Sequence, residues 1–369
     1  MPGVEPSGPP PRRSPPARAL QTARSVLRLG SAAARGWLTG RGAPLQAFLV
    51  LTHRCNGSCL YCGLPRLGTP DLPVEAWRDL ADQLAALGCR RATLLGGEPL
   101  LYAGVGRLAA RLRERGIAVN LTSNGRLAPR RPEVLRRLDS LVLSLDAAGP
   151  ANDLVRGEGA YAAVLAALEA ARAHGVPVKL NAVLSAANGP HLDGLLAFAA
   201  ARRLPLAVGV VRSGDPVLWG RAREVKPPDR EIRRLLVRLA REAVGNPWLV
   251  YSPRSFLLAA RWPDYGVDCL AQGQSLWGVP AGELSPPCAA GRWYFTIDPQ
   301  GRVSPCCVHQ GRPDNPSALE LGLARAWRLA GEHDCRACYS PCLLEQNFLY
   351  AGHPVVLHSF LRRHLRRMV

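Results

Sequence analysis

The sequence predicts an α/β fold, a partial (β/α)6 TIM-like barrel followed by a small cysteine-rich domain. Between residues 46 and 212, six short runs that are apolar almost throughout alternate with longer segments of helical period. Such strands, separated by helices, indicate a parallel sheet covered on both faces. Six units fall short of the eight that close a TIM barrel. Seven cysteines then fall between residues 269 and 350, where the periodicity is weak.

The individual elements follow from this alternation and from glycines placed where helices should stop. The predicted strands are Phe48–Thr52, Ala92–Leu95, Ala118–Thr122, Ser140–Leu145, Val178–Leu184 and Leu206–Val211. The predicted helices between them are Val74–Leu87, Gly104–Arg115, Pro132–Arg137, Tyr161–His174 and His191–Arg202. A further helix is predicted at Asp229–Val244.

The chain is predicted to have five parts. Residues 1–45 form a basic, proline-rich tail with a candidate amphipathic helix at 18–39. The α/β core spans 46–212, and 213–285 is a linker that we expect to shape the substrate cavity. Residues 286–350 form the cysteine-rich domain, and 351–369 form a basic amphipathic helix.

Charge is concentrated at the two ends of the chain. The formal net charge is +19, and residues 1–41 contain seven arginines against a single acid, Glu5. Four further arginines lie in residues 352–369. Basic amphipathic ends suit an anionic membrane surface or an acidic partner. The alternative is a helix docked on the protein with its arginines in water. Nucleic acid is disfavoured because no recognition motif accompanies the charge.

The composition also indicates where in the cell the protein is located. Hydrophobic residues make up 47% of the 369 residues, enough to bury a sizeable core. The sequence contains neither an apolar run of the roughly 18 residues that a membrane span needs nor a signal-peptide pattern. Eleven cysteines in such a chain favour metal or redox chemistry over disulfides. We therefore expect a cytoplasmic protein, with peripheral association on the inner face of the membrane as a further hypothesis.

A cysteine-rich loop follows the first predicted strand, at the end of the sheet where the reactive groups of such folds gather. Cys55, Cys59 and Cys62 have the spacing C-x3-C-x2-C. Three thiolates on a cube of four irons leave one iron open for a further ligand. A zinc site completed by His53, or three free structural thiols, would fit the same spacing.

Polar residues also follow the next three predicted strands. Two glycines let the backbone approach a ligand closely, and Glu98 behind them offers a carboxylate to a cation. Because the carboxyl ends of parallel strands share one edge of a sheet, we expect a single concave polar site. The strand-end residues are Gly96, Gly97, Glu98, Ser123, Asn124 and Ser144.

In this order and spacing, the motifs resemble the radical S-adenosylmethionine (SAM) superfamily over about residues 46–212. They are the cysteine loop, Gly-Gly-Glu-Pro at 96–99, Ser-Asn-Gly at 123–125 and Ser-Leu-Asp at 144–146. The resemblance implies that Cys55, Cys59 and Cys62 hold a [4Fe–4S] cluster. It also implies that Tyr61 lies near the adenine of SAM.

Further roles are implied for the strand ends. Gly96, Gly97 and Glu98 would receive the methionine amino group of SAM. Ser144 and Arg156 would lie near its carboxylate or ribose. The remaining candidates for the same pocket are Ser123, Asn124 and Asn181.

The resemblance implies a radical reaction. An electron from the reduced cluster would cleave SAM to methionine and a 5′-deoxyadenosyl radical, which abstracts hydrogen from an unactivated C–H position of a substrate. Such an enzyme needs an electron donor such as flavodoxin or ferredoxin. The cofactors would carry out the bond cleavage, and the protein would position the reactants and exclude water.

The C-terminal cysteines resemble the SPASM/twitch domains appended to radical SAM enzymes, which bind auxiliary iron–sulfur clusters. The pattern is Cys-x12-Gly-x4-Cys followed by Cys-x2-Cys. It implies one auxiliary [4Fe–4S] cluster on Cys288, Cys306, Cys335 and Cys338, with Cys342 as a substitute ligand. Cys269 and Cys307 would add ligands or be buried thiols, and a zinc ribbon is the alternative for the whole set.

Three functions remain open at this point. The first is oxidation or cross-linking of a residue in a peptide, which the family slightly favours. The second is modification of a lipid or isoprenoid at a membrane surface, which the basic ends favour. The third is a binding protein in which the metal centres are only structural or redox-sensing. The sequence does not name the substrate, because a fold and its cofactor do not fix it.

Overall fold

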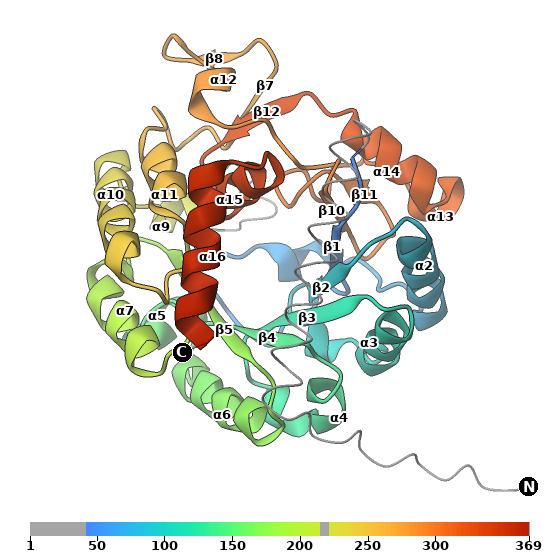
Figure 1. Ribbon diagram of the computed structural model, residues 1–369. Coiled ribbons are helices and arrows are strands. Elements are labelled where there is room, and N and C mark those ends of the chain that lie inside the picture. The colour runs from blue at the N-terminus through green and yellow to red at the C-terminus, as the bar shows by residue number, and fades with distance from the viewer. Residues whose placement is uncertain (1–41, 215–220, 369) are drawn as a thin grey trace, which may run out of the picture.

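The computed structural model describes residues 42–214 and 221–368. Six strands form a parallel sheet in chain order, with each strand paired to the next (Figure 1). Their bounds are β1 Gln46–Val50, β2 Arg91–Leu95, β3 Ala118–Ser123, β4 Ser140–Ser144, β5 Val178–Leu184 and β6 Leu206–Val210. The predicted partial barrel is confirmed, and each predicted strand differs from the observed one by at most two residues at either end.

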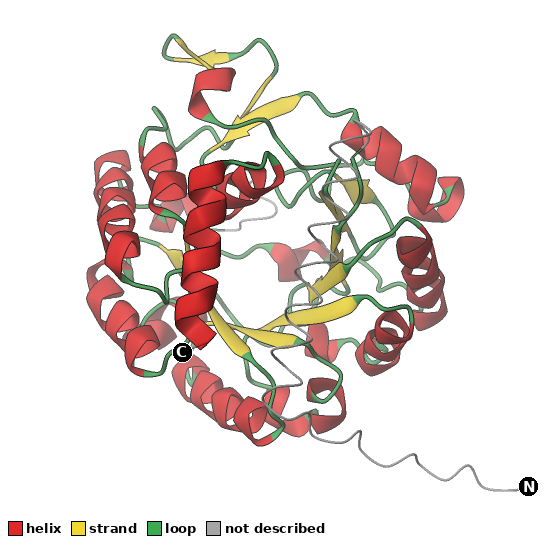
Figure 2. Ribbon diagram, viewed as in Figure 1, coloured by secondary structure: helices red, strands yellow, loops and turns green. Residues whose placement is uncertain are grey.

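Helices surround the curved sheet on its outer side (Figure 2). They pack through apolar faces: in α2 the buried side chains include Trp77, Leu80 and Leu84. Those of the barrel are α2 Val74–Ala86, α3 Val105–Glu114, α4 Pro132–Leu135, α5 Ala151–Arg156, α6 Ala160–Ala173 and α7 Leu192–Ala201. Short 3-10 helices lie at η1 Leu64–Leu67, η2 Pro99–Leu101, η3 Ala128–Arg130 and η4 Gly189–His191. Beyond β6 come α9 Ala222–Val225, α10 Asp229–Gly245 and α11 Pro253–Ala260.

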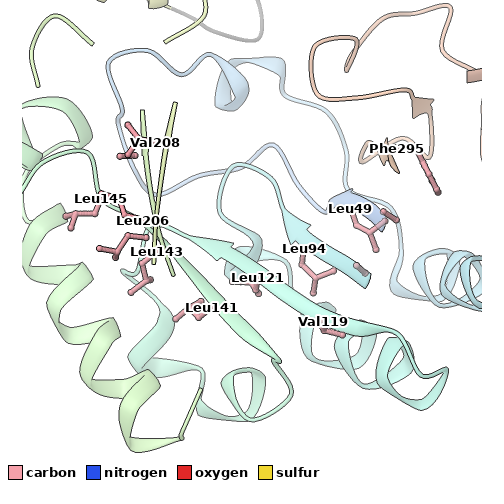
Figure 3. Packing of buried hydrophobic residues seen from close by; sticks show 14 of the residues in the cluster. Leu49, Leu94, Val119, Leu121, Leu141, Leu143, Leu145, Leu206, Val208 and Phe295 are labelled. Atoms are coloured by element: carbon pink, nitrogen blue, oxygen red, sulfur yellow. The ribbon is translucent and has the colours of Figure 1, made fainter. Parts of the chain in front are cut away.

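The main core fills the space between the sheet and this helical layer. Strand residues such as Leu49, Leu94, Leu121 and Leu143 are fully buried and belong to one continuous cluster (Figure 3). Their removal from water is the main force that holds the helices on the sheet, since each buried aliphatic side chain stabilises by roughly 1.5–3 kcal/mol. The packed sheet therefore provides a firm support for the loops at the ends of its strands.

The cysteine-rich region contributes to the same sheet. Strand β10 (Tyr294–Ile297) pairs in parallel with β1, and β11 (Val303–Ser304) pairs antiparallel with β10. The sheet therefore has eight strands in the order β11-β10-β1-β2-β3-β4-β5-β6. All four residues of β10 are buried, and Phe295 packs into the main core (Figure 3).

The rest of the cysteine-rich region is built from small elements. Strands β7 (Cys269–Ala271) and β12 (Cys335–Cys338) pair antiparallel, as do β8 (Ser275–Leu276) and β9 (Val279–Pro280). Figure 1 shows these strands together at one side of the barrel. The helices are α12 Ala281–Leu284, α13 Ala318–Leu321 and α14 Leu323–Gly331.

Two helices end the chain. Helix α15 (Pro341–Tyr350) packs beside β6 and α11. Tyr350, at its end, stacks on Trp293 with ring centroids 5.5 Å apart, just before β10 begins. Helix α16 (Pro354–Met368) therefore starts at the end of the barrel opposite the cysteine loop, and it crosses the front of the view in Figure 1.

The two terminal predictions have different outcomes. The predicted C-terminal helix is present as α16, whereas the candidate helix at 18–39 lies outside the described residues. Among the helices that the structure describes, each is too short or too polar to cross a bilayer.

Candidate active site

The predicted strand-end residues lie at one edge of the sheet. The cysteine loop follows β1, the Gly96-Gly97-Glu98 turn follows β2, and Ser123 ends β3. Ser144 ends β4 and is the register partner of Asn181 in β5. Parallel pairing brings these strand ends side by side, which is where open α/β sheets bind their ligands.

The two glycines bring the β2 turn against the cysteine loop. A Cβ on Gly96 would lie 2.4 Å from the carbonyl oxygen of Thr52, and one on Gly97 would lie 2.3 Å from that of Arg54. Two backbone hydrogen bonds join the turn to the loop. The N–H of Gly97 donates to the Thr52 carbonyl (2.8 Å), and the N–H of Glu98 donates to the Arg54 carbonyl (2.8 Å). The glycines therefore allow close packing of the turn on the cysteine loop, and not only the close approach of a ligand that the sequence predicts.

Glu98 is a fully buried carboxylate. It accepts hydrogen bonds from Ser123 Oγ at 3.0 Å, from the Asn124 backbone N–H at 2.8 Å and from the Leu100 backbone N–H at 3.1 Å. None of its described partners is a cation. Burial raises the pKa of Glu98 to about 7, although the three donors act in the opposite direction. This site therefore favours a positively charged ligand group.

The three thiols of the cysteine loop are partly buried. Cys55 Sγ accepts from the backbone N–H of Gly57 at 3.4 Å and lies 3.8 Å from Asn124 Nδ2. Burial raises the pKa of each of the three thiols, that of Cys59 to about 11. A bound metal would favour the thiolates, because metal coordination displaces thiol protons. Three such thiols on one loop fit an iron–sulfur cluster.

A buried network beside the loop joins two predicted site residues to a third residue. Tyr61 donates from its hydroxyl to Asp146 Oδ2 at 2.8 Å, and Arg156 forms an ion pair with the same carboxylate at 2.7 Å. Arg156 also donates to the Tyr61 hydroxyl at 2.8 Å and reaches Cys59 Sγ at 3.7 Å. Asp146 accepts in addition from the backbone N–H of Val183. The sequence placed Asp146 at a strand end but gave it no role.

The C-terminal cysteines form a second group of neighbouring thiols, separate from the cysteine loop. Cys306 and Cys338 lie in a buried cluster around Trp293 and Tyr294, and Cys269, Cys288 and Cys342 pack against that cluster. The thiol of Cys335 instead falls into a group with Cys269 and His309, whose ligand atoms all lie within 4.8 Å of one another. His309 was not predicted, since a lone histidine carries no spacing signal.

Sequence comparison places the chain among known enzymes. The family model for the radical SAM superfamily matches residues 49–186. A PqqA peptide cyclase from Streptomyces rochei is 31% identical over 302 residues, which cover 78% of this chain and 76% of that protein. The chain belongs to the radical SAM superfamily. A PqqA peptide cyclase from Xanthomonas campestris pv. campestris is 29% identical over 283 residues, covering 71% of this chain and 67% of that protein.

Solved structures show the same fold for this radical SAM enzyme. Streptococcus suis SuiB superposes with a TM-score of 0.60 at 19% identity over 86% of this chain and 72% of SuiB. The structure titled native anSMEcpe with bound AdoMet superposes with a TM-score of 0.56 at 14% identity, covering 86% of this chain and all of that one. In this superfamily a [4Fe–4S] cluster and SAM together supply a 5′-deoxyadenosyl radical, which agrees with the reaction that the motifs predict.

Proposed function

We propose that this radical SAM enzyme modifies a peptide, by oxidising or cross-linking one of its residues. The observation that carries the proposal is the similarity to PqqA peptide cyclase over more than three quarters of both chains. The fold adds support, because SuiB, which shares it, has been solved bound to its precursor peptide SuiA. Glu98, Ser123 and Ser144 are buried at the strand ends, which suits a reaction that must exclude water.

In this proposal Cys55, Cys59 and Cys62 hold the catalytic cluster. Glu98 faces the methionine amino group of SAM, because it is a buried carboxylate whose described partners are all neutral. Ser123 and the backbone of Gly96, Gly97 and Asn124 position that carboxylate and the turn on which it lies. Ser144 and Asn181, side by side at the ends of β4 and β5, remain the candidates for the SAM carboxylate or ribose.

Tyr61 and Arg156 have a different part in the proposal. Their polar atoms are engaged with Asp146 and with one another, so they orient the loop through Cys59. The ring face of Tyr61 remains the candidate for contact with adenine. The C-terminal thiols hold the auxiliary cluster, which we propose to accept the electron left when a substrate radical forms a new bond.

The test uses the full chain, purified anaerobically and reconstituted with iron and sulfide. With dithionite, SAM and candidate peptides encoded next to its gene, we expect 5′-deoxyadenosine and a peptide that has lost hydrogen, both detected by mass spectrometry. Cys55→Ala, Cys59→Ala and Cys62→Ala should each abolish 5′-deoxyadenosine formation. Cys89→Ala is the matched control, because Cys89 is buried and bonded to backbone carbonyls away from the loop. Full turnover by the loop variants would contradict the proposal.

A lipid substrate at a membrane surface is the second candidate. It is favoured by α16, where Val355 and Leu361 are 60% and 51% exposed on a helix rich in arginine. Under this alternative the protein is cytoplasmic and peripheral on the inner face of the membrane. Co-sedimentation with anionic vesicles should then be lost on deletion of residues 354–369 together with 1–41. Binding that survives both deletions would count against it.

The electron donor is a further part of the proposal. A small, acidic electron-transfer protein of the flavodoxin or ferredoxin type suits a chain with a net charge of +19. Its rate of reduction of the cluster should fall steeply as ionic strength rises, which stopped-flow spectroscopy measures. A rate independent of salt would contradict an electrostatically guided donor.

A further inference from the structure

A β-bulge gathers three cysteines on one face of the small β7–β12 sheet. Cys338 is directly opposite Cys269, and Cys335 is directly opposite Ala271. Cys269 and Ala271, two residues apart, point to the same face. Cys335 and Cys338 are three apart and would normally point to opposite faces. The register shift between Cys335 and Ala337 inserts one residue and turns Cys335 to the face of the other two thiols.

His309 approaches this face from a different segment. Its backbone is fixed on both sides: its N–H donates to the Cys306 carbonyl at 3.1 Å, and its carbonyl accepts from Asn315 Nδ2 at 2.8 Å. The side chain is buried, its ring interacts with the Cys269 thiol, and within the described residues its Nε2 has no hydrogen-bonding partner. A buried ring nitrogen without a partner is costly, and a metal ion is one way to satisfy it.

The spacing of the ligand atoms favours a single ion over a cluster. The Cys269 and Cys335 thiols and the His309 ring nitrogen lie within 4.8 Å of one another. Around a single tetrahedral zinc ion, with Zn–S near 2.3 Å and Zn–N near 2.0 Å, such atoms are separated by roughly 3.6–3.8 Å. In an iron–sulfur cube each thiolate binds a different iron, so the sulfurs are held farther apart. Neither thiol is in a disulfide.

We propose that Cys269, His309 and Cys335 bind a single transition-metal ion, for which zinc is the best chemical fit, in addition to the iron–sulfur centres. Two thiolates and one imidazole are the ligands that zinc prefers. Three protein ligands leave a fourth tetrahedral position for water or a small ligand. This site uses two residues, Cys269 and His309, that the auxiliary-cluster pattern does not require.

The proposal also reassigns the neighbouring thiols, and this part rests on the proposed auxiliary cluster. With Cys335 at the single-ion site, four thiols remain beside Tyr294: those of Cys288, Cys306, Cys338 and Cys342. Four is the number that a closed [4Fe–4S] cluster needs. Cys342 then takes the place that the spacing pattern gave to Cys335.

The experiment measures zinc and iron separately in the full chain. Protein reconstituted with iron and sulfide is then exposed to equimolar zinc, desalted, and analysed by mass spectrometry for both metals. We expect about one zinc per chain in the parent protein, by the ligand count above. Cys269→Ser and His309→Ala should lose that zinc while keeping the full iron content. Cys89→Ala is the control and should keep both metals.

Cobalt substitution keeps the proposal testable if Cys269→Ser fails to fold. Co²⁺ in place of zinc should show thiolate-to-metal absorption in the parent protein. His309→Cys should retain the metal and shift the visible bands of Co²⁺, because one nitrogen ligand becomes sulfur. A Co²⁺ spectrum identical in the parent, His309→Ala and His309→Cys would overturn the proposal. Iron lost in His309→Ala would also overturn it, since these residues would then belong to an iron–sulfur cluster. Because neither result requires turnover, failure here is distinct from failure of the peptide-modifying function.

Discussion

At the scale of single residues, the protonation of Glu98 affects the stability of the protein when no ligand is bound. Its pKa of about 7 in the folded protein is above the 4.5 of an ordinary glutamate. The folded chain therefore binds more protons than the unfolded chain between those pH values, and stability falls as pH rises through this window. A cationic ligand group beside the carboxylate would reverse the shift and remove the cost.

Glu98→Gln should therefore flatten the pH dependence of stability in the protein without SAM. Between pH 4.5 and 8 the parent should lose about 3 kcal/mol of unfolding free energy relative to the variant. Urea unfolding at several pH values measures the difference. Parallel pH profiles for the two proteins would show that the carboxyl does not titrate in this range.

Arg156 is expected to act through two neighbouring side chains, those of Asp146 and Cys59. Arg156→Met should leave Asp146 buried without its counter-charge, which costs about 3 kcal/mol of stability. It should also shift the reduction potential of the cluster to more negative values, because a positive charge 3.7 Å from Cys59 Sγ is removed. Potentiometric titration followed by EPR measures this shift. Arg156→Lys should restore most of the potential, and an unchanged potential in both would remove Arg156 from the site.

At the scale of elements, the turn after β2 depends on having no side chain at position 97. Gly97→Ala would push a methyl group against the Arg54 carbonyl, 2.3 Å away, and displace the cysteine loop. We expect a loss of roughly 1–3 kcal/mol in stability and reduced iron incorporation. The matched control is Gly106→Ala in α3, where the nearest atom is 3.6 Å away and the helix should gain up to about 1 kcal/mol. Equal iron content in both variants would contradict the close-packing role of Gly97.

Helix α16 is joined to the rest of the protein by a buried ion pair. Arg363 donates to Glu345 of α15 at 3.0 Å, and the same carboxylate accepts from Ser255 Oγ at 2.7 Å in α11. Arg363→Met leaves that charge buried and should cost about 3 kcal/mol, measured by thermal or urea unfolding. Adding Glu345→Gln should recover part of the loss. The exposed pair Arg107–Glu75 is the control, and Arg107→Met should change stability by no more than about 0.5 kcal/mol.

At the scale of the whole molecule, local patterns predicted the barrel well and long-range neighbours poorly. The buried runs that became β1–β6 carry their signal in five to seven consecutive residues, so periodicity was sufficient. The strand β10 is equally apolar, but its pairing with β1 joins segments about 250 residues apart, and no local signal encodes that. The same holds for Asp146 and His309, whose importance comes from the side chains that the fold brings to them.

The candidate site also combines features that the sequence predicts with contacts that only the fold creates. The cysteine spacing, the Gly-Gly-Glu turn and the strand-end amides could be read directly, because each is a short motif at the end of a strand. The contacts among them could not, since they depend on the direction of each side chain. The bulge in β12 is one extra residue in a four-residue strand, and it changes which thiol faces His309.

The placement of β10 beside β1 has a consequence for synthesis in the cell. Among the described residues, one edge of β1 is paired only by β10, whose last residue, Ile297, is made 247 residues after Val50. At about 5–20 residues per second, that interval is roughly 12 to 50 seconds. During that interval the nascent chain already displays the cysteine loop next to an open strand edge. We therefore expect this strand edge to be prone to wrong pairing until β10 has been made.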